Sequence, residues 1–266
     1  MTIPRALTVA GSDSGGGAGI QADLKAFLAS GVYGLSVITA VTAQNTVGVQ
    51  GVVVLEPSFV RLQLQSVMED IGADAVKTGM LATGEIIQEV AATMDVYRVE
   101  RLVVDPVMVA KSGDRLLDET ALLALREDLL PKALVATPNL PEAEALLEME
   151  IRSPEAMEKA ARLLHGMGVK YAVIKGGHLE GAEALDVVFD GKEIRYLRAP
   201  RYMTPHTHGT GCTFASAIAA GLARGMEPLK AIEYGKRFIT EAIAKALPLG
   251  QGKGPTNPGG LVREVP

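Results

Sequence analysis

The sequence predicts an α/β fold in which helices cover both faces of a mostly parallel central sheet. Short apolar runs rich in β-branched residues alternate along the chain with longer segments of helical periodicity. This alternation is typical of βαβ units, where a helix connects neighbouring parallel strands. The chain has 266 residues, of which 48% are hydrophobic, and shows no internal repeat or convincing linker. We therefore expect a three-layer α/β/α sandwich formed by one domain spanning residues 1–266.

The expected strands are continuous apolar runs, as suits strands that are covered on both faces. They lie at residues 7–10, 36–41, 52–55, 102–104, 134–136, 171–174 and 185–189. The last of these leads into a hairpin over residues 186–197, because Asp190-Gly191 is a turn dipeptide between two strand-like runs. That hairpin predicts antiparallel strands at one edge of the sheet.

Helical periodicity is clearest at residues 18–28, 57–71, 83–96 and 118–130. A further helix is expected from residue 154 to about residue 165, because Ser153 can cap it and Pro154 suits its first turn. The Gly-rich residues 250–260 predict a loosely packed C-terminal segment.

The composition excludes several classes of function. A net charge of -5 and the absence of a Lys/Arg run argue against a nucleic-acid partner. The single cysteine, Cys212, excludes an intrachain disulfide framework and multi-cysteine metal sites, and it suits a reducing cytosol. The N-terminal apolar stretch is too short for a signal peptide, and no segment has about 18 uninterrupted apolar residues. We expect a cytoplasmic protein with no membrane partner.

A glycine-rich turn that runs directly into an Ala-rich helix is the strongest motif, with the sequence HGTGCTFASA at residues 208–217. Gly209, Thr210 and Gly211 predict an anion-binding site, because glycine lets the backbone approach a phosphate and the first helical N–H groups are unpaired. Cys212 would lie in this electropositive mouth, so we expect a lowered thiol pKa that suits a base or a nucleophile. Taken alone, the motif is equally compatible with a small buried cysteine beside a structural turn.

A second glycine-rich loop, residues 11–19, follows the first expected strand, where ligands often bind. It matches neither a Walker A motif nor a dinucleotide fingerprint, so a nucleotide dehydrogenase is poorly supported. By itself this loop is more typical of a tight structural turn.

Polar side chains follow three of the later strands. Asp105 and Glu142 are candidate Mg²⁺ ligands, directly or through water, and Asn139 lies beside Glu142. Lys175 is a candidate for neutralising a transferring phosphoryl group. The alternatives are a turn residue for Asp105, helix caps for Asn139 and Glu142, and a surface lysine at a strand end. His206 and His208 resemble half a metal site but lack further ligands, so we treat them as loop residues.

These motifs occur in the order found in the ribokinase-like superfamily, and the chain resembles the hydroxymethylpyrimidine and hydroxymethylpyrimidine-phosphate kinases of thiamin biosynthesis. The resemblance covers nearly the whole chain. It rests on the ordered motifs GSDSGGGAGIQADLKAF (11–27), VITAVTAQNTVGVQ (37–50), KTGML (77–81), DPVMVAKSG (105–113), TPNLPEA (137–143), KGGH (175–178) and HGTGCT (208–213). One departure is Pro205-His206, where many relatives carry Lys-Asn, so His206 is left without a role.

The resemblance implies a ribokinase-like fold, ATP and Mg²⁺ as cofactors, and a homodimer. It implies that residues 209–211 form an anion hole and that Cys212 is the base for the substrate hydroxyl. It assigns the nucleotide phosphates and Mg²⁺ to Asn139 and Glu142, and a phosphate contact to Lys175. The pyrimidine pocket would be formed by Asp23, Gln44, Met80 and Val107.

The expected activity is ATP-dependent phosphorylation of 4-amino-5-hydroxymethyl-2-methylpyrimidine, of its monophosphate, or of both. A pyridoxine or pyridoxal kinase is the nearest alternative, because its substrate is also a flat ring with a hydroxymethyl arm. Cys212, in place of aspartate, and Gln44 favour the pyrimidine. A hydrolase using Cys212 and His208 and a non-catalytic pyrimidine-binding protein are the remaining alternatives.

Overall fold

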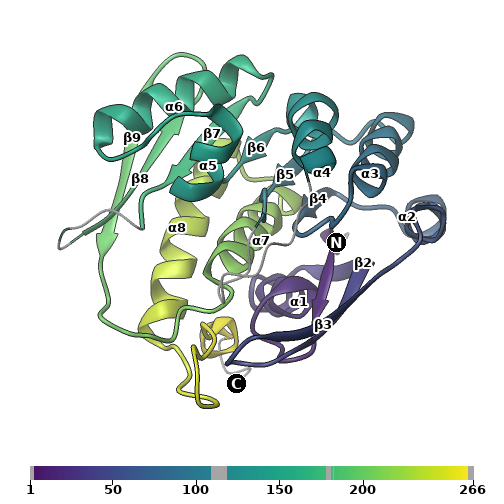
Figure 1. Cartoon of the computed structure of the whole chain (residues 1–266), viewed down its shortest axis with the longest axis horizontal. Helices are drawn as coiled ribbons and strands as arrows, with labels where there is room; N and C mark the ends of the chain where they lie inside the picture. Colours follow the sequence, from purple (N-terminus) through teal and green to yellow (C-terminus); the bar gives the residue numbers. More distant parts are fainter. Residues whose placement is uncertain (1–2, 109–118, 178–180, 182, 263–266) are drawn as a thin grey trace.

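The computed structural model describes residues 3–108, 119–177, 181 and 183–262. Within these residues nine strands form one sheet in the order β3-β2-β1-β4-β5-β6-β7-β8-β9. Helices cover both faces of this sheet, as Figure 1 shows. The predicted three-layer α/β/α sandwich is therefore confirmed.

The centre of the sheet is parallel and its edges are antiparallel. Strands β2, β1, β4, β5, β6 and β7 pair in parallel, whereas β3 pairs with β2, β8 with β7 and β9 with β8 in antiparallel fashion. The predicted hairpin is formed by β8 and β9, with Asp190-Gly191 in the connecting turn. The strands are β1 (Arg5–Asp13), β2 (Tyr33–Gln44), β3 (Val49–Val54), β4 (Ala75–Thr78), β5 (Leu102–Val104), β6 (Val135–Ala136), β7 (Tyr171–Lys175), β8 (Glu183–Phe189) and β9 (Ile194–Pro200).

The helices divide between two hydrophobic cores, one on each face of the sheet. Successive strand residues point to opposite faces, so Leu7 and Val9 enter one core while Ala6 enters the other. The first core contains α2 (Pro57–Asp70), α3 (Gly84–Val96), α4 (Glu119–Ala124), α5 (Leu140–Leu147) and α6 (Pro154–Gly166). The second contains α1 (Gly19–Ala29), α7 (Thr210–Ala223) and α8 (Pro228–Ala244). No helix in the described part of the chain combines the length and the apolar character needed to cross a membrane.

Two elements differ from the expectation. The predicted helix at residues 118–130 is not one α-helix: α4 is followed by a π-helical turn at Leu125–Leu129 and a 3₁₀ turn at Leu130–Lys132. Pro131 lacks an N–H and its ring obstructs a continuing α-helix, which explains the tighter ending. Residue 118, the expected start, lies outside the described residues. Strand β4 was not among the expected strands, since Lys77 interrupts its apolar pattern.

The C-terminal Gly-rich segment is packed, so the expectation of loose packing was wrong. Gly254 and Thr256 are buried, and both bond to the backbone of His208, at 3.1 Å and 3.0 Å. The Asn257 N–H donates to the carbonyl of Ala242 in α8 at 3.0 Å. The segment ends in the 3₁₀ turn Pro258–Leu261. These contacts hold the C-terminal segment against the loop that precedes α7.

Candidate active site

A cavity of about 950 Å³ opens at the carboxyl ends of the parallel strands. Its wall includes Asp13 at the end of β1, Asp105 just after β5 and Lys175 at the end of β7, together with the first turn of α7. Ligands of open α/β sheets bind at this edge, because the strand ends and the following loops converge there. The cavity is therefore the candidate active site.

The glycine turn before α7 forms one wall of the cavity. Gly209 is the N-cap of α7 and has a φ of +78°, in the left-handed region that favours glycine. A β-carbon on Gly209 would lie 1.7 Å from the carbonyl oxygen of Gly17, so the two glycine-rich loops touch here. Gly211 and Thr210 line the cavity, with the Thr210 hydroxyl donating to the Thr207 carbonyl at 2.7 Å. The first N–H groups of the helix and its dipole make this turn a cradle for an anion.

Cys212 lies in the first turn of α7 and lines the cavity, as predicted. Its expected lowered pKa was wrong, however. Burial raises the pKa of the Cys212 thiol to about 12; nearby Lys77 opposes this increase, and the charges of Asp23 and Asp105 reinforce it. Withdrawal from water thus outweighs the helix dipole, and the thiol is protonated near neutral pH.

Asp105 and Lys175 form a buried ion pair at the cavity wall. The Lys175 Nζ lies 2.8 Å from Asp105 Oδ1 and 3.9 Å from Glu142 Oε2. Asp105 Oδ1 also accepts a hydrogen bond from Thr137 at 3.2 Å. A β-carbon on Gly211 would lie 3.2 Å from the Lys175 Nζ, so the lysine reaches the anion cradle. The structure therefore brings together Asp105, Glu142, Lys175 and Gly211, all predicted as site residues.

Asn139 and Glu142 cap α5 and also line the cavity. The Glu142 N–H donates to Asn139 Oδ1 at 2.9 Å, and the Asn139 N–H donates to Glu142 Oε2 at 2.7 Å. The helix-cap interpretation is thus confirmed for both residues. Burial raises the pKa of Glu142 to about 7, with Lys175 opposing the increase and Asp105 adding to it. Glu142 therefore changes its charge near neutral pH.

The acidic groups at this wall fit a magnesium ion held together with phosphate. Asp105 Oδ2 is buried and has no hydrogen-bond partner in the described structure. Glu142 supplies a second carboxylate nearby, whereas no cluster of three or more metal-ligating side chains occurs among the described residues. Mg²⁺ commonly takes one or two carboxylates and completes its shell with water and substrate phosphates. This donor set therefore suits Mg²⁺ in the presence of a nucleotide.

Of the four residues expected to form a ring pocket, all but Asp23 line this cavity. Gln44, Met80 and Val107 line the same cavity as the anion cradle. Asp23 has no exposed surface and is not part of the cavity wall. Its carboxylate accepts hydrogen bonds from Thr8 at 2.6 Å, Ser216 at 2.6 Å and Lys77 at 2.9 and 3.0 Å. The direct substrate contact assigned to Asp23 is corrected, because protein donors occupy both of its oxygens.

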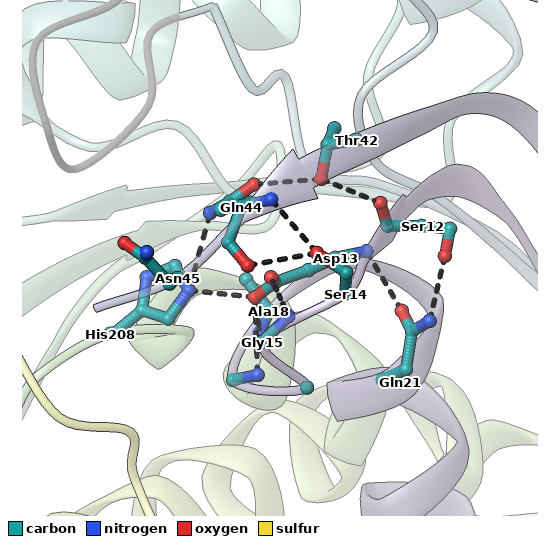
Figure 2. A network of polar contacts seen from close by, with 12 residues as sticks. Ser12, Asp13, Ser14, Gly15, Ala18, Gln21, Thr42, Gln44, Asn45 and His208 are labelled. Atoms are coloured by element: carbon teal, nitrogen blue, oxygen red, sulfur yellow. Dashed lines mark hydrogen bonds and ion pairs between the residues drawn. The ribbon is translucent and has the colours of Figure 1, made fainter. Parts of the chain in front are cut away.

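Three polar residues that line the cavity, Asp13, Lys77 and His208, had no role in the kinase site expected from the sequence. Asp13 accepts hydrogen bonds from the N–H groups of Gly15, Gly17 and Ala18, and His208 Nε2 lies 2.8 Å from Asp13 Oδ2 (Figure 2). Burial would raise the pKa of Asp13, but the bonds from His208 and the loop amides outweigh it and lower that pKa. An aspartate just before a run of glycines is typical of a side chain that closes such a turn.

Another polar pair lies in the same cavity, on the side of α8. Lys236 Nζ is 2.8 Å from Asp186 Oδ2, and Asp186 Oδ1 accepts the Gly176 N–H at 3.1 Å. Both side chains line the cavity beside Ile239. Residues 109–113 and His178, which belong to two of the motifs, lie outside the described residues.

Comparison with known proteins agrees with this geometry. Residues 13–257 match the family model of phosphomethylpyrimidine kinase. The chain is 49% identical over 258 residues to the hydroxymethylpyrimidine/phosphomethylpyrimidine kinase of Bacillus subtilis, which covers 97% of this chain and 95% of that protein. It is 53% identical over 251 residues to a thiamine biosynthesis bifunctional protein of Geobacter sulfurreducens, which covers 94% of this chain but only 51% of that longer protein.

A solved structure also superposes over nearly the whole length. Bacillus subtilis pyridoxal kinase in its ADP complex has a TM-score of 0.92 and 43% identity, covering 98% of this chain and 99% of that one. The fold is therefore that of these vitamin kinases. Together with the match over residues 13–257, this similarity shows that the chain belongs to the phosphomethylpyrimidine kinase family.

Proposed function

We propose that the chain transfers the γ-phosphoryl group of ATP to 4-amino-5-hydroxymethyl-2-methylpyrimidine, to its monophosphate, or to both, in thiamin biosynthesis. The observation that supports this proposal is that one cavity is lined both by the glycine turn before α7 and by Gln44 and Met80. In this proposal Gly211 and Lys175 contact the phosphoryl group, while Gln44 and Met80 contact the ring. A kinase for a small alcohol needs these two subsites side by side, because its catalysis consists mainly of positioning and charge stabilisation.

The residues of the cradle act on the phosphoryl group. The backbone N–H groups of residues 209–211 and the Lys175 ammonium offset the negative charge that develops during in-line transfer. The hydroxymethyl oxygen bonds to phosphorus, the bond to the β-phosphate oxygen breaks, and ADP leaves. The hydroxyl proton passes to Cys212 as its base and then to solvent. Only the thiolate form can take up this proton, so the raised pKa of Cys212 makes activity increase with pH.

Asp105 and Glu142 are the residues that would hold Mg²⁺, with Asn139 fixing Glu142 through the capping box. The unpartnered Asp105 Oδ2 supports this assignment. When bound, Mg²⁺ neutralises charge on the nucleotide phosphates. The Lys175 Nζ lies 2.8 Å from Asp105 Oδ1, so Asp105 would contact both the lysine and Mg²⁺. Before the nucleotide binds, the positive charge of Lys175 offsets the negative charges of Asp105 and Glu142.

A pyridoxal kinase remains the second candidate, because the ADP complex of that enzyme has the same fold over 98% of this chain. The Cys/His hydrolase is not favoured, since His208 Nε2 bonds to Asp13 and no hydrogen bond joins His208 to Cys212 among the described residues. The non-catalytic alternative offers no reason for a lysine that is ion-paired with buried Asp105 at an anion cradle.

The test is ADP formation by purified protein with Mg-ATP and one acceptor at a time: hydroxymethylpyrimidine, its monophosphate or pyridoxine. We expect turnover with a pyrimidine acceptor, a large loss in Cys212→Ala, and a raised KM for the pyrimidine in Gln44→Ala. Turnover with pyridoxine alone would favour the second candidate. Absence of turnover with every acceptor by folded protein would refute the kinase proposal.

We further propose that the chain acts in the cytoplasm as a homodimer. Strand β3 pairs only with β2 and lies at the edge of the sheet (Figure 1), and its residues Val52, Val53 and Val54 are 45%, 66% and 42% exposed. An exposed apolar edge strand is a natural site for self-association. Light scattering on the wild type and on Val53→Glu tests this: a dimer that the substitution dissociates supports it, and a wild-type monomer at micromolar concentration contradicts it.

A further inference from the structure

His208 is fixed from several sides where the two glycine-rich loops meet. Its backbone N–H donates to the Gly254 carbonyl at 3.1 Å, and its carbonyl accepts the Thr256 N–H at 3.0 Å. A β-carbon on Gly17 would lie 2.4 Å from the imidazole Cδ2, so the first loop packs directly on the ring. Because both the backbone and the ring are enclosed, the imidazole has one position, with Nε2 toward Asp13 (Figure 2).

Asp13 determines which ring nitrogen of His208 carries a hydrogen. The pKa of this carboxyl is lowered, so Asp13 is an acceptor only. At 2.8 Å from Asp13 Oδ2, His208 Nε2 must therefore carry a hydrogen, whether the imidazole is neutral or charged. This one hydrogen is donated to Asp13, so a further group beside Nε2 can share it only in a longer three-centre contact, and that group must then be an acceptor.

The Gln44 carboxamide is that further group. Gln44 Nε2 lies 3.5 Å from His208 Nε2, and Gln44 Oε1 lies 3.2 Å from Thr42 Oγ1. Thr42 has one hydroxyl hydrogen, which it donates at the shorter distance of 2.9 Å to the Ser12 carbonyl. Thr42 Oγ1 thus offers a lone pair to Gln44, while His208 offers a hydrogen. The Gln44 carboxamide can form both hydrogen bonds when it is rotated by about 180° around its terminal bond, so that Oε1 faces His208 and the NH₂ group faces Thr42.

The backbone of Gln44 is fixed by Ser14, so it cannot move to accommodate the opposite orientation of the carboxamide. The Ser14 hydroxyl accepts the Gln44 N–H and donates to the Gln44 carbonyl, both at 2.8 Å. The terminal amide is then the part of Gln44 whose orientation is left to be set by its neighbours. Figure 2 shows Asp13, His208, Gln44 and Thr42 as one connected polar network.

We propose that His208 is a positioning residue: its Nε2–H, held by Asp13, orients the Gln44 carboxamide and so sets which hydrogen-bonding group Gln44 presents to the edge of the pyrimidine ring. This inference rests on the proposed function, in which Gln44 contacts that ring. A reversed amide would place donor against donor or acceptor against acceptor, which weakens binding by about 10- to 100-fold. Because His208 directly precedes Gly209, the same residue joins the ring pocket to the anion cradle.

Binding calorimetry with hydroxymethylpyrimidine and, separately, with Mg-ADP tests the proposal independently of turnover. His208→Leu should raise the Kd for the pyrimidine about 10- to 100-fold and leave the Kd for Mg-ADP within about threefold. His208→Gln, whose amide places an N–H near the position of Nε2, should recover most of the loss. His206→Leu is the matched control, because the His206 Nδ1 accepts the Gly254 N–H at 3.1 Å, while no hydrogen bond in the described structure joins His206 to Asp13 or Gln44.

A double-mutant comparison separates positioning from general structure. In a Gln44→Ala background His208→Leu should add less than about threefold to the Kd for the pyrimidine, because both substitutions remove the same interaction. Full additivity, or equal losses for pyrimidine and Mg-ADP, would overturn the proposal. If His208→Leu does not fold, His208→Asn replaces it: its shorter amide does not reach the position of Nε2, and it should also weaken pyrimidine binding at least tenfold.

The outcomes also distinguish the two proposals. Wild-type protein that binds the pyrimidine without phosphorylating it would refute the kinase activity, while the Kd values would still decide the role of His208. Wild-type protein that does not bind the pyrimidine would overturn both. Nitrogen-detected NMR of the imidazole provides a direct check, since the proposal requires a hydrogen on His208 Nε2 and a bare Nε2 contradicts it.

Discussion

Substituting Gly209 by alanine should disable the site through a steric clash that a matched glycine elsewhere does not suffer. Gly209 has a φ of +78° and Gly31, after the end of α1, has a φ of +70°. An added β-carbon would lie 1.7 Å from the Gly17 carbonyl oxygen at position 209, whereas at position 31 nothing lies within 4 Å. The two alanine variants therefore share the backbone penalty and differ in the clash.

The expected magnitudes follow from this difference. A left-handed alanine costs roughly 1–2 kcal/mol, so Gly31→Ala should lower the free energy of unfolding by about that amount and leave kinetics unchanged. At position 209 the two loops must separate by more than about 1 Å, and a displacement of that size in positioned groups can cost about 100-fold in rate. Gly209→Ala should therefore lose at least about 100-fold in kcat/KM, beyond its loss of stability.

Steady-state ADP formation and urea unfolding of both variants measure these two effects. Circular dichroism first confirms that each variant is folded at the assay temperature. A folded Gly209→Ala that retains kcat/KM within about fivefold of the wild type, or a Gly31→Ala that loses activity to the same extent, would exclude a clash at Gly209 as the cause.

Three further results are expected. With a Cys212 pKa of about 12, kcat should rise about tenfold per pH unit up to the pH at which the protein unfolds. In Cys212→Asp, kcat should become independent of pH at a lower pH, whereas a wild-type kcat that is already constant near pH 7 would contradict this. As Glu142 ionises near pH 7, the KM for Mg-ATP should fall with rising pH, but stay constant in Glu142→Gln; parallel profiles would exclude that role. Lys77→Met leaves buried Asp23 without its counter-charge and should lower the free energy of unfolding in urea by about 3–5 kcal/mol. Adding Asp23→Leu should recover most of this loss, and a loss under about 1 kcal/mol in Lys77→Met would disprove the coupling.

Local patterns predicted the layers of the fold and one part of the site. The alternation of apolar runs and helical segments predicted the sandwich, since periodicity depends only on near neighbours. The position of Asp105 and Lys175 after strands placed them at one sheet edge, and the glycine turn before Cys212 predicted the anion cradle. Each of these inferences uses residues that are close in sequence.

Contacts between distant segments could not be predicted in this way. Asp13 and His208 are 195 residues apart and Lys77 and Asp23 are 54 apart, so neither pairing leaves a local pattern. The pKa of Cys212 was predicted in the wrong direction, because the helix terminus is visible in the sequence whereas burial is a property of the assembled fold. The packed C-terminal segment was likewise missed, since its glycines suggest a loop while its partners lie in other loops.

If this site phosphorylates the hydroxymethyl group of the pyrimidine, the identity of the product will show it. Folded wild-type protein is incubated with Mg-ATP and hydroxymethylpyrimidine, and the mixture is analysed by mass spectrometry and phosphorus NMR. We expect a pyrimidine phosphate ester formed in equal amount to ADP, or a diphosphate formed with two equivalents of ADP. ADP released without a phosphorylated pyrimidine, or unchanged substrates, would contradict it.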